Sequence, residues 1–265
     1  MAKYNKLVGK HVVVIGGTRG IGRGVVEASL EAGARVTLIG SSQRSVSTAA
    51  SQLKTAYPDH GDRINCLNCD LSKDTVEADL DAVLSAATAK GSIDHIVFTA
   101  ADGLTLGTLH DLSLEQMRQA AHMRLYVPTL LGKLASRHLK STDSDSHSEK
   151  SLILTTGGIA DKPAPGWSLI AYFAAGLTGL TRNLALDLSP VRVNAVEPGV
   201  VNTELWDATG MSPEQKDAQF RVLSSKYPTG RVAAVEDVAE AYVYLMKDRN
   251  ATGEVVRTRS GDHLV

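Results

Sequence analysis

The sequence is poor in cysteine, carries almost no net charge and has no long apolar run. It has 2 cysteines in 265 residues, and 28 basic against 29 acidic side chains leave a net charge of -1. So little cysteine excludes a disulfide scaffold, and balanced charge offers no field that attracts nucleic acid or anionic lipid. A membrane helix needs about 20 consecutive apolar residues, which no stretch provides. We therefore expect a cytoplasmic protein without a nucleic-acid or membrane partner, with enough apolar residues (43%) for one sizeable core.

The two cysteines have a C-x-x-C spacing. Cys66 and Cys69 raise the question of a metal or redox site, but a zinc site needs two more ligands, and none is near in the sequence. The surrounding residues alternate like a strand, in which side chains three positions apart point to opposite faces. We predict structural cysteines and no metal site.

Apolar runs of strand length alternate with stretches of helical period along the chain. Strands that are apolar on both faces belong in a parallel sheet covered by helices. We therefore predict an α/β fold in which residues 1–265 form one domain, with a doubly wound parallel sheet flanked by helices. The polar segment 141–150 is predicted to be an exposed loop. The predicted strands are 11–15, 35–39, 64–69, 93–99, 151–156, 191–196 and 254–258, and the predicted helices are 23–32, 45–57, 75–90, 114–139 and 168–188.

A glycine-rich turn follows the first predicted strand and opens the first helix. Gly16, Gly20 and Gly22 have the spacing G-x-x-x-G-x-G. Glycines at such a turn allow a tight bend and let the backbone approach a pyrophosphate, whose charge then lies at the helix N-terminus. This placement favours a dinucleotide-binding fold of Rossmann type over a merely tight strand-to-helix connection.

The end of the second predicted strand indicates which dinucleotide binds. NAD-binding folds usually place Asp or Glu there, about 20 residues beyond the first glycine, to hold the ribose hydroxyls. This chain has Ser41, Ser42 and Arg44 instead. A carboxylate would repel a 2′-phosphate, whereas hydroxyls together with Arg44 and Arg19 can bind it through charge-assisted hydrogen bonds. We predict NADP(H); the alternative is that both arginines are solvated surface charges.

The glycine spacing and three further segments resemble the short-chain dehydrogenase/reductase family. These are Cys69-Asp70-Leu71, Ala100-Ala101 and the run from Asn194 to Thr203. They match the family's adenine-contacting motif, part of its Asn-Ala-Gly turn and its nicotinamide-side segment, and the resemblance covers essentially the whole chain. Together with the features above, it implies these NADP(H)-binding residues: Gly16, Thr18, Arg19, Gly20, Ile21, Gly22, Ser41, Ser42, Arg44, Asp70, Leu71, Ala100, Ala101, Pro198, Gly199, Val201 and Thr203.

Most of the family's proton-transfer residues are missing. Family members use a Ser, a Tyr, a Lys four residues after that Tyr, and an Asn on the preceding long helix. Here Tyr172 is present, but Gly176 stands four residues later. The Ser position falls at Gly157 or Gly158, and the Asn position is Arg124. A tyrosine has an ordinary pKa near 10 and needs a neighbouring cation to lower it, so we expect Tyr172 to stay protonated.

The loss of the lysine favours a substrate that is already charged. An iminium ion accepts hydride from a nicotinamide without a protein acid. A missing lysine also removes Coulomb repulsion of about 4 kcal/mol at 4 Å in an intermediate dielectric. We therefore predict an NADP(H)-dependent reductase of iminium carbons. Two alternatives stay open: a carbonyl reductase in which Tyr172, helped by Asp102 or Asp161, supplies the proton, and a non-catalytic NADP-binding protein.

Three residues besides Tyr172 and Arg124 are candidates for contacting substrate. Asp102 and Asp161 follow strand ends, where such folds bind ligands, and could pair with a cation, donate a proton, or cap a turn. Trp167 follows two prolines and offers a surface for stacking a bulky ligand, or is a hydrophobic plug. The predicted catalytic residues are thus Tyr172, Arg124, Asp102, Asp161 and Trp167.

One fungal branch of the family is the most similar. The similarity lies in Arg124, the stretch Pro163-Ala164-Pro165-Gly166-Trp167 and the absent lysine. This branch includes the bifunctional reductase/Diels-Alderases of bicyclic indole-alkaloid biosynthesis, which use NADPH on an iminium intermediate. The resemblance implies reduction in alkaloid biosynthesis, with an associated Diels-Alder role. Those enzymes carry an aspartate where this sequence has Ala164, so reduction is the activity that we predict to be shared.

The resemblance also bears on the substrate and on self-association. A segment at about 203–228 lies where the family has a substrate lid, and its Trp206 and Phe220 predict a bulky, apolar substrate. Gly176 and Gly179 each weaken a helix by about 1 kcal/mol relative to Ala, which close packing against another subunit would offset. We expect a homodimer or homotetramer.

Overall fold

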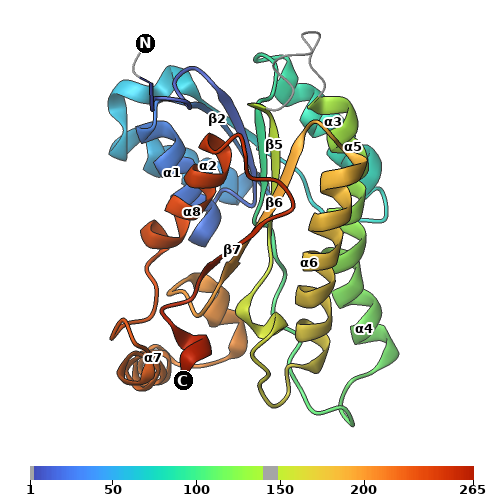
Figure 1. Ribbon diagram of the computed structural model, residues 1–265, viewed down its shortest axis with the longest axis vertical. Coiled ribbons are helices and arrows are strands. Elements are labelled where there is room, and N and C mark those ends of the chain that lie inside the picture. The colour runs from blue at the N-terminus through green and yellow to red at the C-terminus, as the bar shows by residue number, and fades with distance from the viewer. Residues whose placement is uncertain (1–2, 140–148) are drawn as a thin grey trace.

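A seven-stranded parallel sheet runs through the protein (Figure 1). The structure is a computed structural model that describes residues 3–139 and 149–265. The strands are β1 (His11–Ile15), β2 (Arg35–Gly40), β3 (Ile64–Asn68), β4 (His95–Phe98), β5 (Ser151–Thr155), β6 (Arg192–Pro198) and β7 (Val255–Thr258). Their order is β3-β2-β1-β4-β5-β6-β7, and all neighbours pair in parallel. The predicted doubly wound parallel sheet of Rossmann type, flanked by helices, is confirmed.

Helices cover both faces of the sheet (Figure 1). One face is covered by α1 (Gly20–Glu31), α2 (Gln43–Ala56) and α8 (Val235–Lys247). The other face is covered by α3 (Val76–Thr88), α5 (Val127–His138) and α6 (Ser168–Asp187). The two remaining helices, α4 (Leu114–Ala121) and α7 (Pro213–Lys226), lie toward the end of the molecule at which the strands finish.

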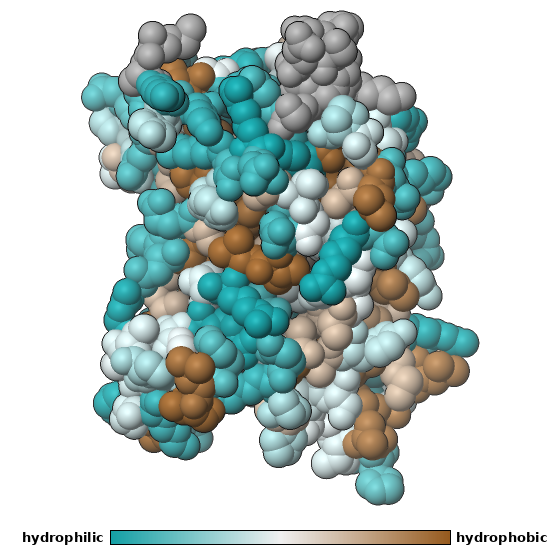
Figure 2. Space-filling view, viewed as in Figure 1, coloured by the Kyte–Doolittle hydropathy of each residue, from teal (hydrophilic) through white to brown (hydrophobic). Residues whose placement is uncertain are grey.

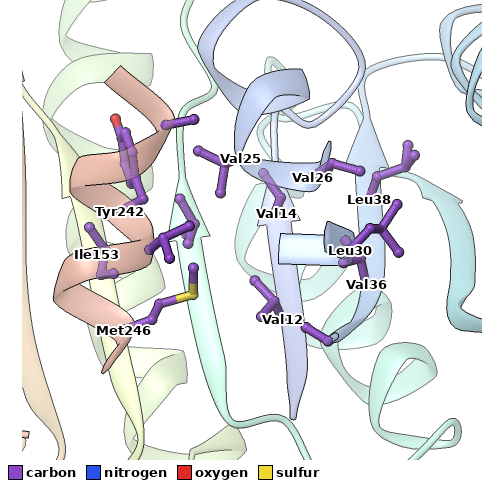
Figure 3. Packing of buried hydrophobic residues seen from close by; sticks show 14 of the residues in the cluster. Val12, Val14, Val25, Val26, Leu30, Val36, Leu38, Ile153, Tyr242 and Met246 are labelled. Carbon is purple, nitrogen blue, oxygen red and sulfur yellow. The ribbon is translucent and has the colours of Figure 1, made fainter. Parts of the chain in front are cut away.

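Consecutive residues of the central strands face the two cores alternately. On β1, Val12 and Val14 pack with α1, α2 and α8, and Figure 3 shows this cluster. Val13 and Ile15 pack on the other side with α3 and α5. Full burial of an aliphatic side chain contributes about 1.5–3 kcal/mol, so a strand that is apolar on both faces is most stable in the middle of a covered sheet.

Cys66 and Cys69 face opposite cores, as their spacing predicts. Cys66 packs at the margin of the α1–α2–α8 cluster, and Cys69 belongs to the cluster on the other face. Burial raises the pKa of both thiols, that of Cys69 to about 11. Within residues 3–139 and 149–265, no three His, Cys, Asp or Glu side chains form a group that could hold a metal ion.

The predicted helix 114–139 is interrupted. α4 ends at Ala121, and a π-helical turn (His122–Tyr126) joins it to α5. In this π-turn the Val127 N–H donates to the carbonyl of His122, five residues back. Pro128, which has no N–H to continue an ordinary helical ladder, lies at the start of α5. The π-turn carries Arg124.

Sequence analysis missed α8. This helix packs closely against α1, and its inward face is fully apolar except for one hydroxyl. The valine, alanine and leucine positions follow helical spacing, which was a usable signal. The buried residues of α8 are Val238, Ala239, Tyr242, Val243, Leu245 and Met246.

The predicted exposed loop 141–150 ends in a buried residue. Residues 141–148 lie outside the described residues, but Lys150 is buried rather than exposed, and its ammonium group donates to Ser92 Oγ at 2.9 Å.

The helix α6 has open space beside its two glycines. Apart from the adjacent residues and the nearby backbone of α6 itself, no described atom lies within 4 Å of the Cβ position of Gly176 or Gly179. The close packing expected at these glycines is therefore not found within the described chain. α6 is long and apolar enough to cross a membrane by length and composition, a test that a core helix of this kind also passes.

Candidate active site

A cleft opens where the strands β1, β2 and β4 end. Its volume is about 310 Å³. In the sheet, β1 has β2 on one side and β4 on the other, so the strand order reverses at β1. Ligands of such folds bind at this topological switch point. The lining residues are Ile15, Gly16, Thr18, Arg19, Gly20, Ile21, Gly22, Ile39, Gly40, Ser41, Cys69, Asp70, Leu71, Ser72, Thr99, Ala100, Ala101, Asp102, Met123, Thr203, Glu204 and Leu205.

The glycine turn brings main-chain atoms to the wall of the cleft. Gly16 has φ +90°, and a Cβ there would lie 2.6 Å from the Ala100 nitrogen. A Cβ at Gly22 would overlap the carbonyl oxygen of Gly16. Only glycine fits at these two positions, so backbone lines this part of the cleft at the N-terminus of α1.

Most of the predicted cofactor-binding residues line the cleft. From the glycine turn and the strand ends these are Gly16, Thr18, Arg19, Gly20, Ile21, Gly22, Ser41, Asp70, Leu71, Ala100, Ala101 and Thr203. The side chain of Asp70 accepts hydrogen bonds from Ser72 N at 3.1 Å and Ser72 Oγ at 2.7 Å. These bonds lower the pKa of Asp70, so a carboxylate faces the cleft.

Five predicted cofactor residues do not line the cleft. Ser42 caps α2, its Oγ accepting from Ser45 N at 3.2 Å, and Arg44 lies exposed on the first turn of that helix. Val201 is 4% exposed and packs in the core. The other two, Pro198 and Gly199, end β6 or follow it, and Gly199 packs on the backbone of Arg259.

The arginines predicted to bind a 2′-phosphate are unpaired. Arg19 lines the cleft and Arg44 lies beside Ser41 and Ser42. Both are exposed, and neither has a hydrogen-bond or ion-pair partner within residues 3–139 and 149–265. Both guanidinium groups are therefore available to an anion.

Arg124 and Asp102 form an ion pair at the substrate side of the cleft. Arg124 Nη2 lies 2.7 Å from Asp102 Oδ1 and also donates to the main-chain oxygens of Asp102 and Gly103. Burial raises the pKa of Asp102, and the charge of Arg124 partly opposes this rise. Apart from this contact, Asp102 Oδ1 and Arg124 Nε, both buried, make no hydrogen bond among the described residues.

Asp161 lies away from this pair. Its carboxylate bridges Arg259 Nη1 and Arg257 Nη2, the second at 3.0 Å. Burial alone would raise its pKa, but the hydrogen bond and the charges of the two arginines outweigh burial and lower it. A carboxylate held in this way is a poor proton donor near neutral pH.

The structure does not bring Tyr172 to the cleft. Its side chain is 69% exposed on α6, its ring packs edge-on against Phe173 at 5.3 Å, and it is absent from the lining residues. The phenol has no hydrogen-bond partner in the described part of the chain. Trp167, half-buried just before α6, contacts Trp206 with ring centres 6.5 Å apart.

Sequence reasoning missed several residues at or near the site. Glu204 lines the cleft beside Thr203, and its Oε2 lies 3.6 Å from the Cβ position of Gly20. Its place directly after the Thr203 motif was an available signal. Arg259 is buried behind the site, and two of its carboxylate partners, Asp161 and Glu197, lie 98 and 62 residues away in the sequence, so no local pattern marks it.

The fold and the cleft are those of a Rossmann-type α/β protein. A family model described as an SDR-like rossmann domain matches residues 3–265. The chain belongs to the short-chain dehydrogenase/reductase family and is an oxidoreductase of that family.

The similar proteins include fungal members of this family. The chain is 37% identical over 264 residues to the short-chain dehydrogenase/reductase fsr5 of Gibberella fujikuroi, covering 98% of this chain and 97% of that protein. It is 39% identical over 262 residues to malC of Malbranchea aurantiaca, covering 96% and 95%. The structure of the MalC reductase/Diels-Alderase matches with a TM-score of 0.89 at 38% identity, covering 99% of each chain. A small-chain dehydrogenase in complex with NADPH matches with a TM-score of 0.73 at 25% identity, covering 97% and 100%. The predicted resemblance to this fungal branch is confirmed.

Proposed function

We propose that the chain is an NADP(H)-dependent reductase that transfers hydride to an iminium carbon in a bulky, apolar specialised metabolite. The observation that carries this proposal is the open space at Gly176, where no described side chain lies within 4 Å of the Cβ position. Among the described residues, no ammonium group is hydrogen-bonded to the Tyr172 phenol, beside which the family has its lysine. A carbonyl needs a proton as it is reduced, whereas an iminium carbon needs none.

The glycine turn supports NADP(H) as the cofactor. The space left by the missing side chains of Gly16 and Gly22 suits a diphosphate against main-chain N–H groups at the N-terminus of α1. The unpaired guanidinium groups of Arg19 and Arg44, with Ser41, suit a 2′-phosphate. When bound, the nicotinamide supplies the hydride. A similar small-chain dehydrogenase in complex with NADPH agrees with this assignment.

The ion pair of Asp102 and Arg124 presents a carboxylate oxygen to a cationic substrate without adding net positive charge. Its Oδ1 is a buried acceptor without a hydrogen bond in the described residues, and Asp102 lines the cleft. Arg124 keeps this carboxylate in place by its ion pair and by its two bonds to main-chain oxygens. The pair is neutral overall, so it accepts a cation without the repulsion that a fixed ammonium group would add.

Aromatic residues support a bulky substrate and a lid at 203–228. Trp206 donates its indole N–H to Val201 O at 3.0 Å, which fixes its ring between Trp167 and Phe220. Phe220 is 7% exposed and supports the ring of Trp206, and the half-buried rings of Trp167 and Trp206 offer a surface on which a flat apolar ligand can stack. MalC is named a reductase/Diels-Alderase, and this similarity supports reduction as the main activity with cycloaddition as an associated one. A role in alkaloid biosynthesis is part of the same proposal.

The exposed surface of α6 and of the π-turn before α5 suits a second copy of the chain, giving a homodimer or homotetramer. Leu125 and Tyr126 on the π-turn and Tyr172 on α6 are 43%, 52% and 69% exposed. The open surface at Gly176 and Gly179 permits close approach of another helix. Light scattering coupled to size exclusion tests this expectation directly.

The reaction is tested by NADPH consumption with a panel of cyclic imines and matched ketones. We expect turnover of imines and none of ketones, and Tyr172→Phe should leave imine turnover within about twofold because the phenol donates no proton. Gly176→Lys restores an ammonium group in open space, and it should lower imine turnover several-fold relative to the neutral Gly176→Gln. Loss of imine turnover in Tyr172→Phe would refute the mechanism.

The raised pKa of Asp102 favours a second candidate. A carboxyl that stays protonated at higher pH can donate to a carbonyl oxygen. In that case ketones turn over, the rate falls as pH rises, and Asp102→Asn abolishes it. Tight NADPH binding without turnover of either panel would instead indicate a non-catalytic NADP-binding protein.

A further inference from the structure

We propose that Arg259 is a positioning residue that fixes the substrate-side segment 158–167 to the C-terminal segment 257–265. The proposal rests on the proposed function for its kinetic consequence, but its structural consequence is independent of any activity. Arg259 follows β7, and its side chain is 1% exposed. A buried guanidinium is costly unless carboxylates surround it, so its partners are tightly defined.

Three carboxylates surround this guanidinium. Arg259 Nη1 lies 2.8 Å from Glu197 Oε1, and Nε lies 2.7 Å from Asp262 Oδ1. Both of these carboxylates are buried, at 3% and 9% exposure. The third, from Asp161, is 39% exposed and also pairs with Nη1. Glu197 and Asp262 thus hold Arg259 in place, and Arg259 in turn holds Asp161.

A second set of contacts joins the same two segments. Arg257 Nη2 lies 3.0 Å from Asp161 Oδ2, and Arg257 Nε lies 3.2 Å from Glu197 Oε1. Lys162 donates to the main-chain oxygens of Asp262 and, at 2.7 Å, Val265. Figure 2 shows a strongly hydrophilic surface next to the C-terminal end, below the apolar side chains over β7. Adjacent residues 161 and 162 are therefore both tied to the C-terminal segment.

Gly158 and Arg259 depend on each other. A Cβ at Gly158 would lie 2.9 Å from Arg259 Nε and 3.1 Å from its Cζ. The guanidinium therefore fills the space that a side chain at Gly158 would need. A serine there, at one of the two places expected for the family's catalytic serine, would displace Arg259 from its carboxylates.

The contacts of Asp161 and Lys162 lie close in sequence to the aromatic residues of the site. Five residues after Lys162 comes Trp167, whose ring contacts Trp206. The Gly166 carbonyl accepts from Gly107 N at 3.0 Å, which ties the same segment to the loop after β4. Releasing Asp161 should therefore loosen Trp167 and its contact with the lid, while the glycine turn at the cofactor end stays as it is.

The test uses full-length variants and two readouts. Asp161→Asn keeps the shape and removes the charge, and Asp161→Glu is the conservative variant. We expect Asp161→Asn to increase hydrogen exchange in peptides covering 158–167 and to raise KM for the imine about tenfold with little change in kcat. NADPH affinity should stay within about twofold, and Asp161→Glu should restore part of the protection. Asp237→Asn, which breaks the exposed pair with Arg231, is the matched control and should change neither readout.

Two further variants test the same link from its arginine side. Arg259→Lys retains the charge but cannot bridge three carboxylates, and it should resemble Asp161→Asn. If Arg259→Lys does not fold, Arg257→Gln tests the same link from an exposed position. Unchanged hydrogen exchange over 158–167 in both Asp161→Asn and Arg257→Gln would overturn the proposal. Increased exchange in a protein that reduces no imine would support the anchor and refute only the proposed function.

Discussion

Arg124 Nη2 lies 2.7 Å from Asp102 Oδ1, and this ion pair connects the π-turn to the loop that follows β4. The two residues are 22 positions apart, and both side chains are largely buried, with exposures of 15% and 26%. The pair joins two of the five residues predicted to be catalytic. Asp102 itself lines the cleft.

A double-mutant cycle should detect this pair. Arg124→Gln leaves a partly buried carboxylate without its cation and should lower the free energy of unfolding by about 1–2 kcal/mol, since the pair is partly solvated. Asp102→Asn should cost less, because Arg124 keeps its two hydrogen bonds to main-chain oxygens. Urea denaturation of both single variants and the double variant should give a coupling of at least about 0.5 kcal/mol. Purely additive effects would contradict the ion pair.

Replacing Arg44 should discriminate between the two dinucleotides. An exposed arginine that binds a 2′-phosphate contributes about 1.4 kcal/mol, so Arg44→Ala should weaken NADPH about tenfold and leave NADH unchanged. Fluorescence titration with each cofactor measures this. Arg182→Ala, an exposed arginine on α6, is the control. Equal losses for both cofactors would refute the phosphate assignment.

Neutralising Glu204 should strengthen cofactor binding. Its carboxylate lies 3.6 Å from the Cβ position of Gly20, at the N-terminus of α1 where a diphosphate is proposed to bind. Like charges repel there, so Glu204→Gln should lower the Kd for NADPH about three- to tenfold, with a larger effect at low salt. An unchanged or higher Kd at 20–50 mM salt, roughly the range in which screening is weak, would show that Glu204 does not face the diphosphate.

His95 should make the fold less stable below neutral pH. It is buried, its Nδ1 lies 2.9 Å from Ser151 Oγ, and burial lowers its pKa well below the ordinary value of 6.5. As pH falls through 6.5, the unfolded chain binds a proton that the folded chain does not, so stability is lost on acidification. Between pH 7.5 and 5.5 this loss amounts to about 1.4 kcal/mol.

Urea denaturation at these two pH values tests the assignment. His95→Asn should reduce the pH dependence by about that amount, whereas His110→Asn, which alters an exposed histidine, should not. Identical pH dependence in the wild-type protein and His95→Asn would contradict it.

The strands could be predicted because each carries its own signal. Val12 to Ile15 is apolar on both faces, and such a run is stable mainly as a central strand of a sheet that helices cover on both sides. The break at His122–Tyr126 was not predicted, because the apolar pattern continues through it and only Pro128 hints at the change. At the site, glycine spacing predicted the cleft, but the roles of Asp161 and Asp102 depend on partners in space. Asp161 pairs with Arg259, 98 residues away, and no local pattern reveals such a pair.

The wall at Gly16 and Gly22 consists of peptide groups, and this has an evolutionary consequence. Peptide groups are the same whatever residues neighbour them, so sequence drift around this wall alters its hydrogen-bonding surface very little. Asp102, elsewhere on the cleft wall, and Trp167, outside the lining, present side chains instead, and a change in a single codon can replace either one. Among homologues we expect substitutions to concentrate there, so that new substrates are acquired while nucleotide recognition is inherited.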